Sequence, residues 1–175
     1  MKFWTVDDFQ KFINHTTKPL YRISFLILFW TGMRVGEFLA LTLEDFDFDK
    51  NLIHINKSYA RLDNVVLIGP PKTPKSRRDV TIPTFLVDEI QRFIRMQHSI
   101  DSNTRLFETS KDALGNEIKR VTARIGIEKI RVHDLRHSHA SYLIHRGIPI
   151  IAISQRLGHE KIETTLQTYA HLYPQ

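Results

Sequence analysis

The chain of 175 residues contains no cysteine, which excludes a disulfide scaffold, a thiolate nucleophile and any cysteine-ligated zinc or iron–sulfur site. It also lacks a long apolar run, because its most apolar stretch, residues 20–30, is too short to cross a bilayer and contains Arg22 and Ser24. No signal peptide is recognisable, since the first residues, MKFWTVDDFQKF, have no apolar core or small-residue cleavage site. These absences predict a soluble, cytoplasmic protein with no membrane contact.

Low-complexity tracts, internal repeats and long linkers are also absent, so residues 1–175 are expected to form one domain. A hydrophobic fraction of 42% with 25% charged residues is ordinary for a globular protein and excludes wholesale disorder. The net charge of +6 indicates a polyanionic partner. The basic excess is densest at residues 72–78, which hold Lys72, Lys75, Arg77 and Arg78 and no acid.

Hydrophobic periodicity predicts an α+β fold that is mainly helical. Phe46, Phe48, Ile53 and Ile55 alternate with polar residues around 49–51 and predict a β-hairpin. Two further strand patterns, at 59–68 and 79–82, extend the hairpin to a small antiparallel sheet. A capping-box pattern opens the first helix, and glycines end several others. The expected helices cover 6–17, 20–31, 34–41, a segment after Pro83 that includes 85–94, 110–125, 133–146, 149–157 and 162–172.

Several polar residues stand at element ends, where they can face one point, and their chemistry suits a phosphodiester. Two guanidiniums can hold phosphoryl oxygens through planar, two-pronged contacts and stabilise the charge of a transition state. A tyrosine hydroxyl becomes a nucleophile once a base takes its proton, and a lysine can protonate the leaving oxygen. A further imidazole can donate a hydrogen bond to phosphate, and no metal or other cofactor is needed. The candidates are Arg34 and Arg136, Tyr169, His133 as base, Lys72 as general acid, and His159.

Four motifs in this chain resemble the catalytic domain of tyrosine recombinases, the phage and transposon integrase family. They are TGMRVGEFLAL at 31–41, PKTPKSRRDVTIP at 71–83, HDLRHSHASYLIHRG at 133–147 and RLGHEKIETTLQTYAHLYP at 156–174. The details of the second and fourth motifs look most like integrases of phages and conjugative elements from Gram-positive hosts.

The resemblance implies site-specific DNA recombination, in which strands of duplex DNA are cut and rejoined through a 3′-phosphotyrosyl intermediate. It places Arg34, Lys72, His133, Arg136 and His159 around the scissile phosphate and makes Tyr169 the nucleophile. Lys72 is chosen over Lys75 because it matches the Lys-Thr of the family's hairpin turn. Lys75, Arg77 and Arg78 are expected to contact DNA phosphates, with solvated turn residues as the alternative.

Family members carry core-binding and arm-binding domains before this region and a tail after the tyrosine. We therefore expect a catalytic-domain fragment that is monomeric by itself, from a protein that acts as a homotetramer on DNA.

Three other functions fit parts of the sequence. A type IB topoisomerase-like activity would use the same chemistry to relax supercoiled DNA, and a non-catalytic module would keep the fold for DNA binding alone. A zinc hydrolase would use His133 and His137, which are four residues apart, although a third ligand is not evident and Arg136 would place a cation beside the metal. Unlike the candidate base His133, His137 and His139 are expected to be structural or exposed. Glu37 is expected to orient Arg34 or a neighbouring helix, with a surface i,i+3 pair as the alternative.

Overall fold

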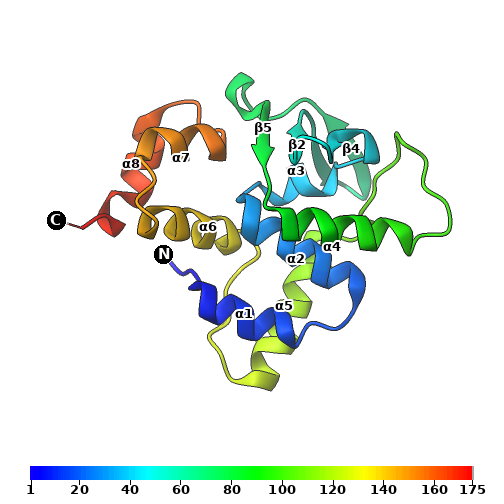
Figure 1. Ribbon diagram of the computed structural model, residues 1–175, viewed down its shortest axis with the longest axis horizontal. Coiled ribbons are helices and arrows are strands. Elements are labelled where there is room, and N and C mark those ends of the chain that lie inside the picture. The colour runs from blue at the N-terminus through cyan, green and yellow to red at the C-terminus, as the bar shows by residue number, and fades with distance from the viewer. Residues whose placement is uncertain (175) are drawn as a thin grey trace.

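The computed structural model describes residues 1–174, and most of its regular structure is helical (Figure 1). The strands lie together at one side of the helical body (Figure 1). Within the described residues, no helix is sufficiently long and apolar to traverse a membrane. The helices are α1 (Val6–Asn14), α2 (Pro19–Thr31), α3 (Val35–Leu39), α4 (Thr84–Arg95), α5 (Lys111–Ile125), α6 (Asp134–His145), α7 (Ile150–Leu157) and α8 (Ile162–Tyr169), with the 3₁₀ turns η1 (Leu43–Asp45), η2 (Pro74–Ser76) and η3 (Ala170–Leu172).

Local sequence signals set the helix boundaries. Thr5 and Asp8 form the predicted capping box at the start of α1. Gly32 and Gly158 end α2 and α7 with φ of 71° and 77°, a left-handed conformation that residues with a Cβ adopt at a cost. The expected helix 6–17 ends at Asn14, and the expected helix 162–172 continues only as η3 after Tyr169. Each expected helix is present as a helix, and the differences between expected and observed ranges lie at the helix ends.

The strands form two sheets rather than the single sheet expected. The first has the antiparallel order β1 (Phe46–Asp47), β2 (Leu52–Ile55), β5 (Arg78–Thr81), with Ile53 paired to both Phe46 and Val80. The expected strand 59–68 is instead a hairpin of its own, β3 (Ser58–Leu62) and β4 (Val65–Gly69). Asp63 and Asn64 have φ of 50° and 63°, which is the two-residue turn that folds a strand back on itself.

A large hydrophobic core surrounds α2, whose residues Phe25, Ile27 and Phe29 are fully buried. Helix α2 packs against α4 and α6, and α1 covers part of the same core with Phe9 stacked on Phe29 at 4.0 Å between ring centroids. A second, smaller cluster joins α6 to α7 and α8 and includes Tyr169. The C-terminal helices therefore pack on α6 in the same chain (Figure 1).

Candidate active site

The site lies where the C-terminal ends of α2 and α7 meet α6, and Arg136 is the residue that joins them. Its Nη1 donates to the Gly32 carbonyl at 2.8 Å, and its Nη2 donates to the Leu157 carbonyl at 2.7 Å. Both carbonyls belong to the terminal turns of helices, where backbone oxygens lack partners within the helix. The residue is only 3% exposed. Its guanidinium is therefore fixed in orientation, and its remaining N–H groups can donate to an anion.

Arg34 stands two residues after Gly32 and immediately before α3, so the turn that ends α2 also brings this second guanidinium to the site. Arg34 Nη1 is buried and has no hydrogen-bond partner within residues 1–174; the nearest carboxylate oxygen, Glu37 Oε2, is 3.6 Å away. A buried donor without a partner is costly, and a bound anion would satisfy it. Burial lowers the pKa of Arg34, and Arg78 lowers it further, against the effects of Glu37 and Tyr169.

Glu37 is the carboxylate of this cluster, and its main partner differs from the one expected. Its backbone contact is with the N–H of Arg34, which donates to Oε1 at 2.8 Å. Its two oxygens also accept a bidentate pair of hydrogen bonds from Arg78, at 2.9 and 3.0 Å. Burial raises the pKa of Glu37, but Arg78 and Arg34 more than offset that effect and hold the pKa below its usual value.

Arg78 was expected to contact DNA, and its position corrects that prediction. Its side chain is only 7% exposed. Besides Glu37, the guanidinium donates to the Arg156 carbonyl at 2.7 Å and to the Ser76 carbonyl at 2.5 Å. Arg78 lies on the same face of β5 as the buried Val80, because alternate strand residues share a face. It therefore ties β5 to α3 and α7 within the protein.

Tyr169, at the end of α8, is brought to the site by the packing of α8 on α7 and α6. The residue is 1% exposed, and its hydroxyl lies 2.7 Å from His137 Nδ1. Burial raises the pKa of Tyr169 to about 12, although Arg136 and Arg34 both act in the opposite direction. The phenol is therefore neutral at neutral pH and lies within the field of both guanidiniums.

The histidine in contact with Tyr169 is His137, which was expected to be structural or exposed, and not His133. His133 is exposed at the start of α6, one helical turn from His137, and the two rings meet edge to face at 5.0 Å between centroids. Part of the His133 side chain is still covered by the protein, and this partial burial, together with His137 and Arg136, lowers the pKa of His133 to about 4. The four-residue spacing of His133 and His137 predicts that both lie on one face of the helix. The sequence does not indicate which of them contacts Tyr169.

His159 follows Gly158 and is half-buried beside the guanidiniums. Its Nδ1 lies 2.6 Å from the Thr165 hydroxyl, which leaves Nε2 as the atom that can reach a ligand. Burial lowers the pKa of His159 to about 4, and Arg136, Arg34 and Arg78 contribute to the same shift. The imidazole is thus neutral at neutral pH.

The remaining basic residues lie on the turn between β4 and β5, outside this cluster. Lys72 is exposed, and within residues 1–174 no hydrogen bond or ion pair joins it to the site. Lys75 and Arg77 are exposed and, together with Lys161, line an open pocket of about 690 Å³ beside His159. The structure therefore brings together five of the six predicted catalytic residues, Arg34, His133, Arg136, His159 and Tyr169, and leaves Lys72 on the neighbouring turn.

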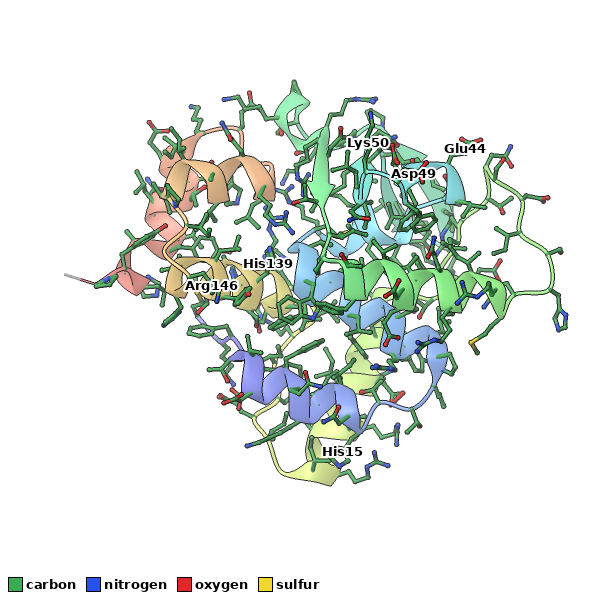
Figure 2. All side chains as sticks on the ribbon, in the orientation of Figure 1. His15, Glu44, Asp49, Lys50, His139 and Arg146 are labelled. Atoms are coloured by element: carbon green, nitrogen blue, oxygen red, sulfur yellow. The ribbon has the colours of Figure 1, made fainter. Side chains whose placement is uncertain are left out.

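A buried histidine and a half-buried arginine behind the site support it. His139 lies on α6 (Figure 2) and is 2% exposed. Its Nε2 accepts a hydrogen bond from Arg156 Nε at 2.9 Å. Arg156 also donates to the carbonyls of Trp30 and Thr81, so it connects α7 to α2 and β5. His139 is thus structural, one of the two roles expected for it.

The site as a whole is cationic. Three guanidiniums, those of Arg34, Arg78 and Arg136, face the carboxylate of Glu37, and each lowers the pKa of at least one other member of the cluster. Burial and the neighbouring arginines lower the pKa of Arg136 to about 9, so it remains charged at neutral pH. No group of three or more histidine, cysteine, aspartate or glutamate residues in the described part of the chain is placed to hold a metal ion. A bound phosphate would offset the excess positive charge.

Comparison with known proteins agrees with this geometry. The profile of the phage integrase family matches residues 2–175. The chain belongs to the phage integrase family. It is 35% identical over 189 residues to the ICEBs1 integrase of Bacillus subtilis strain 168, an alignment that covers 99% of this chain and 51% of that integrase. This family member thus spans about half the length of that curated relative.

Two solved structures share the fold of this integrase-family chain. The Tn1549 transposon integrase in complex with transposon right end DNA matches with a TM-score of 0.83 at 21% identity, over 99% of this chain and 61% of that one. The catalytic domain of bacteriophage HP1 integrase matches with a TM-score of 0.68 at 23% identity, over 99% of this chain and 89% of that one. The predicted family and the mainly helical α+β fold are thereby confirmed.

Proposed function

We propose that residues 1–175 are the catalytic domain of a tyrosine-type site-specific recombinase, an integrase that cuts and rejoins duplex DNA. The observation that carries this proposal is the convergence of a tyrosine hydroxyl with two guanidiniums in one buried cluster. Arg34 Nη1 is buried with no hydrogen-bond partner among residues 1–174, Arg136 is held by two helix-end carbonyls, and both arginines act electrostatically on Tyr169. A phosphodiester would complete this arrangement.

In the proposed reaction, Tyr169 Oη attacks the scissile phosphorus while an imidazole of α6 takes the phenol proton. Arg34, Arg136 and the Nε2 of His159 donate to the phosphoryl oxygens, where charge develops in the transition state. The bond from phosphorus to the 5′-oxygen breaks, and Lys72 protonates that oxygen from the exposed turn beside the site. The products are a 3′-phosphotyrosyl ester and a free 5′-hydroxyl, and the reverse reaction with a second 5′-hydroxyl rejoins the strand without a cofactor.

The proposed ligand is duplex DNA, with Lys75 and Arg77 on its backbone. Their exposure beside His159 supports this placement. The related Tn1549 integrase was solved in complex with transposon right end DNA, which supports the same class of ligand here. As part of a full-length integrase the domain would act in a homotetramer in the cytoplasm, while the domain by itself would be a monomer.

The test is covalent trapping on DNA. The chain is incubated with a pool of nicked duplexes that contain a randomised segment, and protein–DNA adducts are recovered, sequenced and mapped to the attached residue. The parent chain is expected to form adducts through Tyr169, whereas Tyr169→Phe forms none and keeps its non-covalent DNA affinity. Tyr142→Phe is the matched control, because Tyr142 packs on Trp30 away from the site. Adducts in Tyr169→Phe at the parent level would refute the proposal.

A further inference from the structure

The proposed reaction needs a base for the phenol, and the first turn of α6 with its N-cap offers two histidines, His133 and His137. We infer that His137, rather than His133, is the catalytic base that takes the proton of Tyr169. This inference rests on the proposed function. The observation behind it is direct contact, since His137 Nδ1 lies 2.7 Å from Tyr169 Oη, within the range of an O–H···N hydrogen bond. A general base must lie within hydrogen-bond distance of the proton that it removes.

The surroundings of His137 leave Nδ1 as the proton acceptor. Its other nitrogen, Nε2, lies 4.0 Å from Asp134 Oδ1, so a proton on Nε2 is favoured electrostatically. The Asp134 carboxylate is itself held by Arg131, whose backbone N–H and guanidinium both donate to it. With the ring proton on Nε2, Nδ1 carries the lone pair, and the phenol O–H donates to it. Asp134, His137 and Tyr169 thus form a line from carboxylate to imidazole to hydroxyl.

The charged groups around His137 keep it neutral and able to accept a proton. Burial lowers the pKa of His137, and Arg136, Arg131 and the N-terminal ammonium lower it further, against the effect of Asp134. The phenol does need such a partner, because burial raises the pKa of Tyr169 to about 12. The proton therefore moves as the oxygen–phosphorus bond forms, when Arg34 and Arg136 stabilise the charge on the phosphoryl oxygens.

The step balances in both directions. In cleavage, the O–H bond of Tyr169 breaks, its proton goes to His137 Nδ1, the Oη–P bond forms and the P–O5′ bond breaks, with the proton for the leaving oxygen supplied by Lys72. In ligation, a 5′-hydroxyl attacks the phosphorus and gives its proton to the neutral Lys72 amine, the P–O5′ bond forms and the P–Oη bond breaks, and the protonated His137 returns its proton to the departing phenolate. His133, exposed at the start of α6, is left to donate to a phosphate oxygen.

The decisive variant is His137→Asn. Its amide occupies the position of Nδ1 and can still bond to the phenol, but it cannot accept a proton. Histidine and asparagine have similar helix propensities, so α6 is expected to persist. Adduct formation is measured on a duplex that carries the sequence recovered by the trapping experiment. His137→Asn is expected to slow the reaction by about 10²- to 10⁴-fold, the usual contribution of general acid–base catalysis. His145→Asn, on an exposed position of the same helix, should leave the rate unchanged.

A DNA substrate with sulfur in place of the bridging 5′-oxygen distinguishes a general base, which acts on the nucleophile, from a general acid, which acts on the leaving group. The thiolate leaves without protonation, since a thiol has a pKa of about 8.5. The substitution should restore the rate of Lys72→Ala, whose defect lies in the leaving group, and should not restore His137→Asn, whose defect lies in the nucleophile. His137→Gln provides a second variant, and thermal unfolding and non-covalent DNA affinity establish that each variant is folded.

Three results would overturn the inference. A rate for folded His137→Asn within about three-fold of the parent would show that no proton passes to His137. Restoration of the His137→Asn rate by the sulfur substrate would show that His137 acts on the leaving group. A faster reaction of His137→Asn than of the parent would show that His137 restrains the phenol and does not activate it. If the parent chain formed no adduct at all, the proposed function itself would fail, which is a different outcome from a defect confined to the His137 variants.

Discussion

Replacement of Arg78 by alanine tests whether this arginine belongs to the protein interior or to the DNA interface. The variant removes a guanidinium that donates four hydrogen bonds, two to Glu37 and one each to the carbonyls of Arg156 and Ser76. It leaves the Glu37 carboxylate, 2% exposed as a side chain, with the Arg34 backbone N–H at 2.8 Å and Arg34 Nη1 at 3.6 Å.

The expected loss of stability follows from these contacts. Removal of one partner of a buried ion pair costs roughly 3–5 kcal/mol. Because Glu37 keeps one hydrogen bond and one nearby cation, we place Arg78→Ala at the lower end, about 3 kcal/mol, which corresponds to a fall in Tm of about 6–12 °C. A double-mutant cycle with Glu37→Gln should give a coupling energy of about 1–3 kcal/mol.

Urea unfolding of the parent and the variant at pH 7 and pH 4 measures this effect. In the parent, the Glu37 pKa lies below its usual value, so Glu37 contributes stability that is present above about pH 4.5 and is lost as the pH falls through the lowered pKa. In Arg78→Ala, one of the two cations that offset the effect of burial is absent, so the pKa of Glu37 rises. The difference in unfolding free energy between the two proteins should therefore shrink as the pH falls below about 4.5.

Arg77→Ala is the matched control, because Arg77 is the exposed neighbour of Arg78. It should change stability by less than about 0.5 kcal/mol and lower the salt dependence of DNA binding by about one counterion. If Arg78→Ala lost less than about 1 kcal/mol and showed the reduced salt dependence instead, the buried ion pair would not hold α3 to β5 as described.

Other substitutions and conditions test the remaining contacts. Gly32→Ala should cost about 1–2 kcal/mol in urea unfolding, because Gly32 has φ of 71°, and an unchanged unfolding midpoint would contradict this. Arg34→Lys and Arg136→Lys should each slow adduct formation by about 10²- to 10³-fold at saturating DNA, since an ammonium cannot reproduce a planar two-pronged contact; near-parent rates would argue against two guanidiniums on one phosphate. His133 and His159 have a pKa of about 4 in the folded chain, whereas unfolded histidine titrates near 6.5, so the unfolding free energy should fall as the pH is lowered from about 6.5 to 4. A rise in stability across that window would show that these imidazoles are not held neutral.

Local signals in the sequence determined much of this protein. Periodicity and caps placed each helix to within a few residues, because a turn such as Gly32 or a box such as Thr5 with Asp8 acts on its immediate neighbours. The motifs around Arg34, Arg136 and Tyr169 identified the family, and their chemistry indicated a phosphodiester as the ligand.

The role of Arg78 was decided by tertiary structure. A run of basic residues predicts surface charge, but the partner of each guanidinium depends on which distant segments meet it. Arg77 and Arg78 are adjacent in sequence and point to opposite sides of the chain, one to solvent and the other to Glu37. The alternation of side chains between the two faces of β5 does indicate that Arg78 points inward, because Arg78 lies on the same face as the buried Val80.

Tertiary structure also decided which histidine contacts the Tyr169 hydroxyl. Helical spacing places His133 and His137 on one face of α6, and only the docking of α8 selects His137 as the neighbour of the hydroxyl. Sequence fixes which side chains a helix presents, since backbone geometry is local. Which of those side chains meet depends on burial of the apolar cluster between α6, α7 and α8, which is a cooperative property of three separate helices.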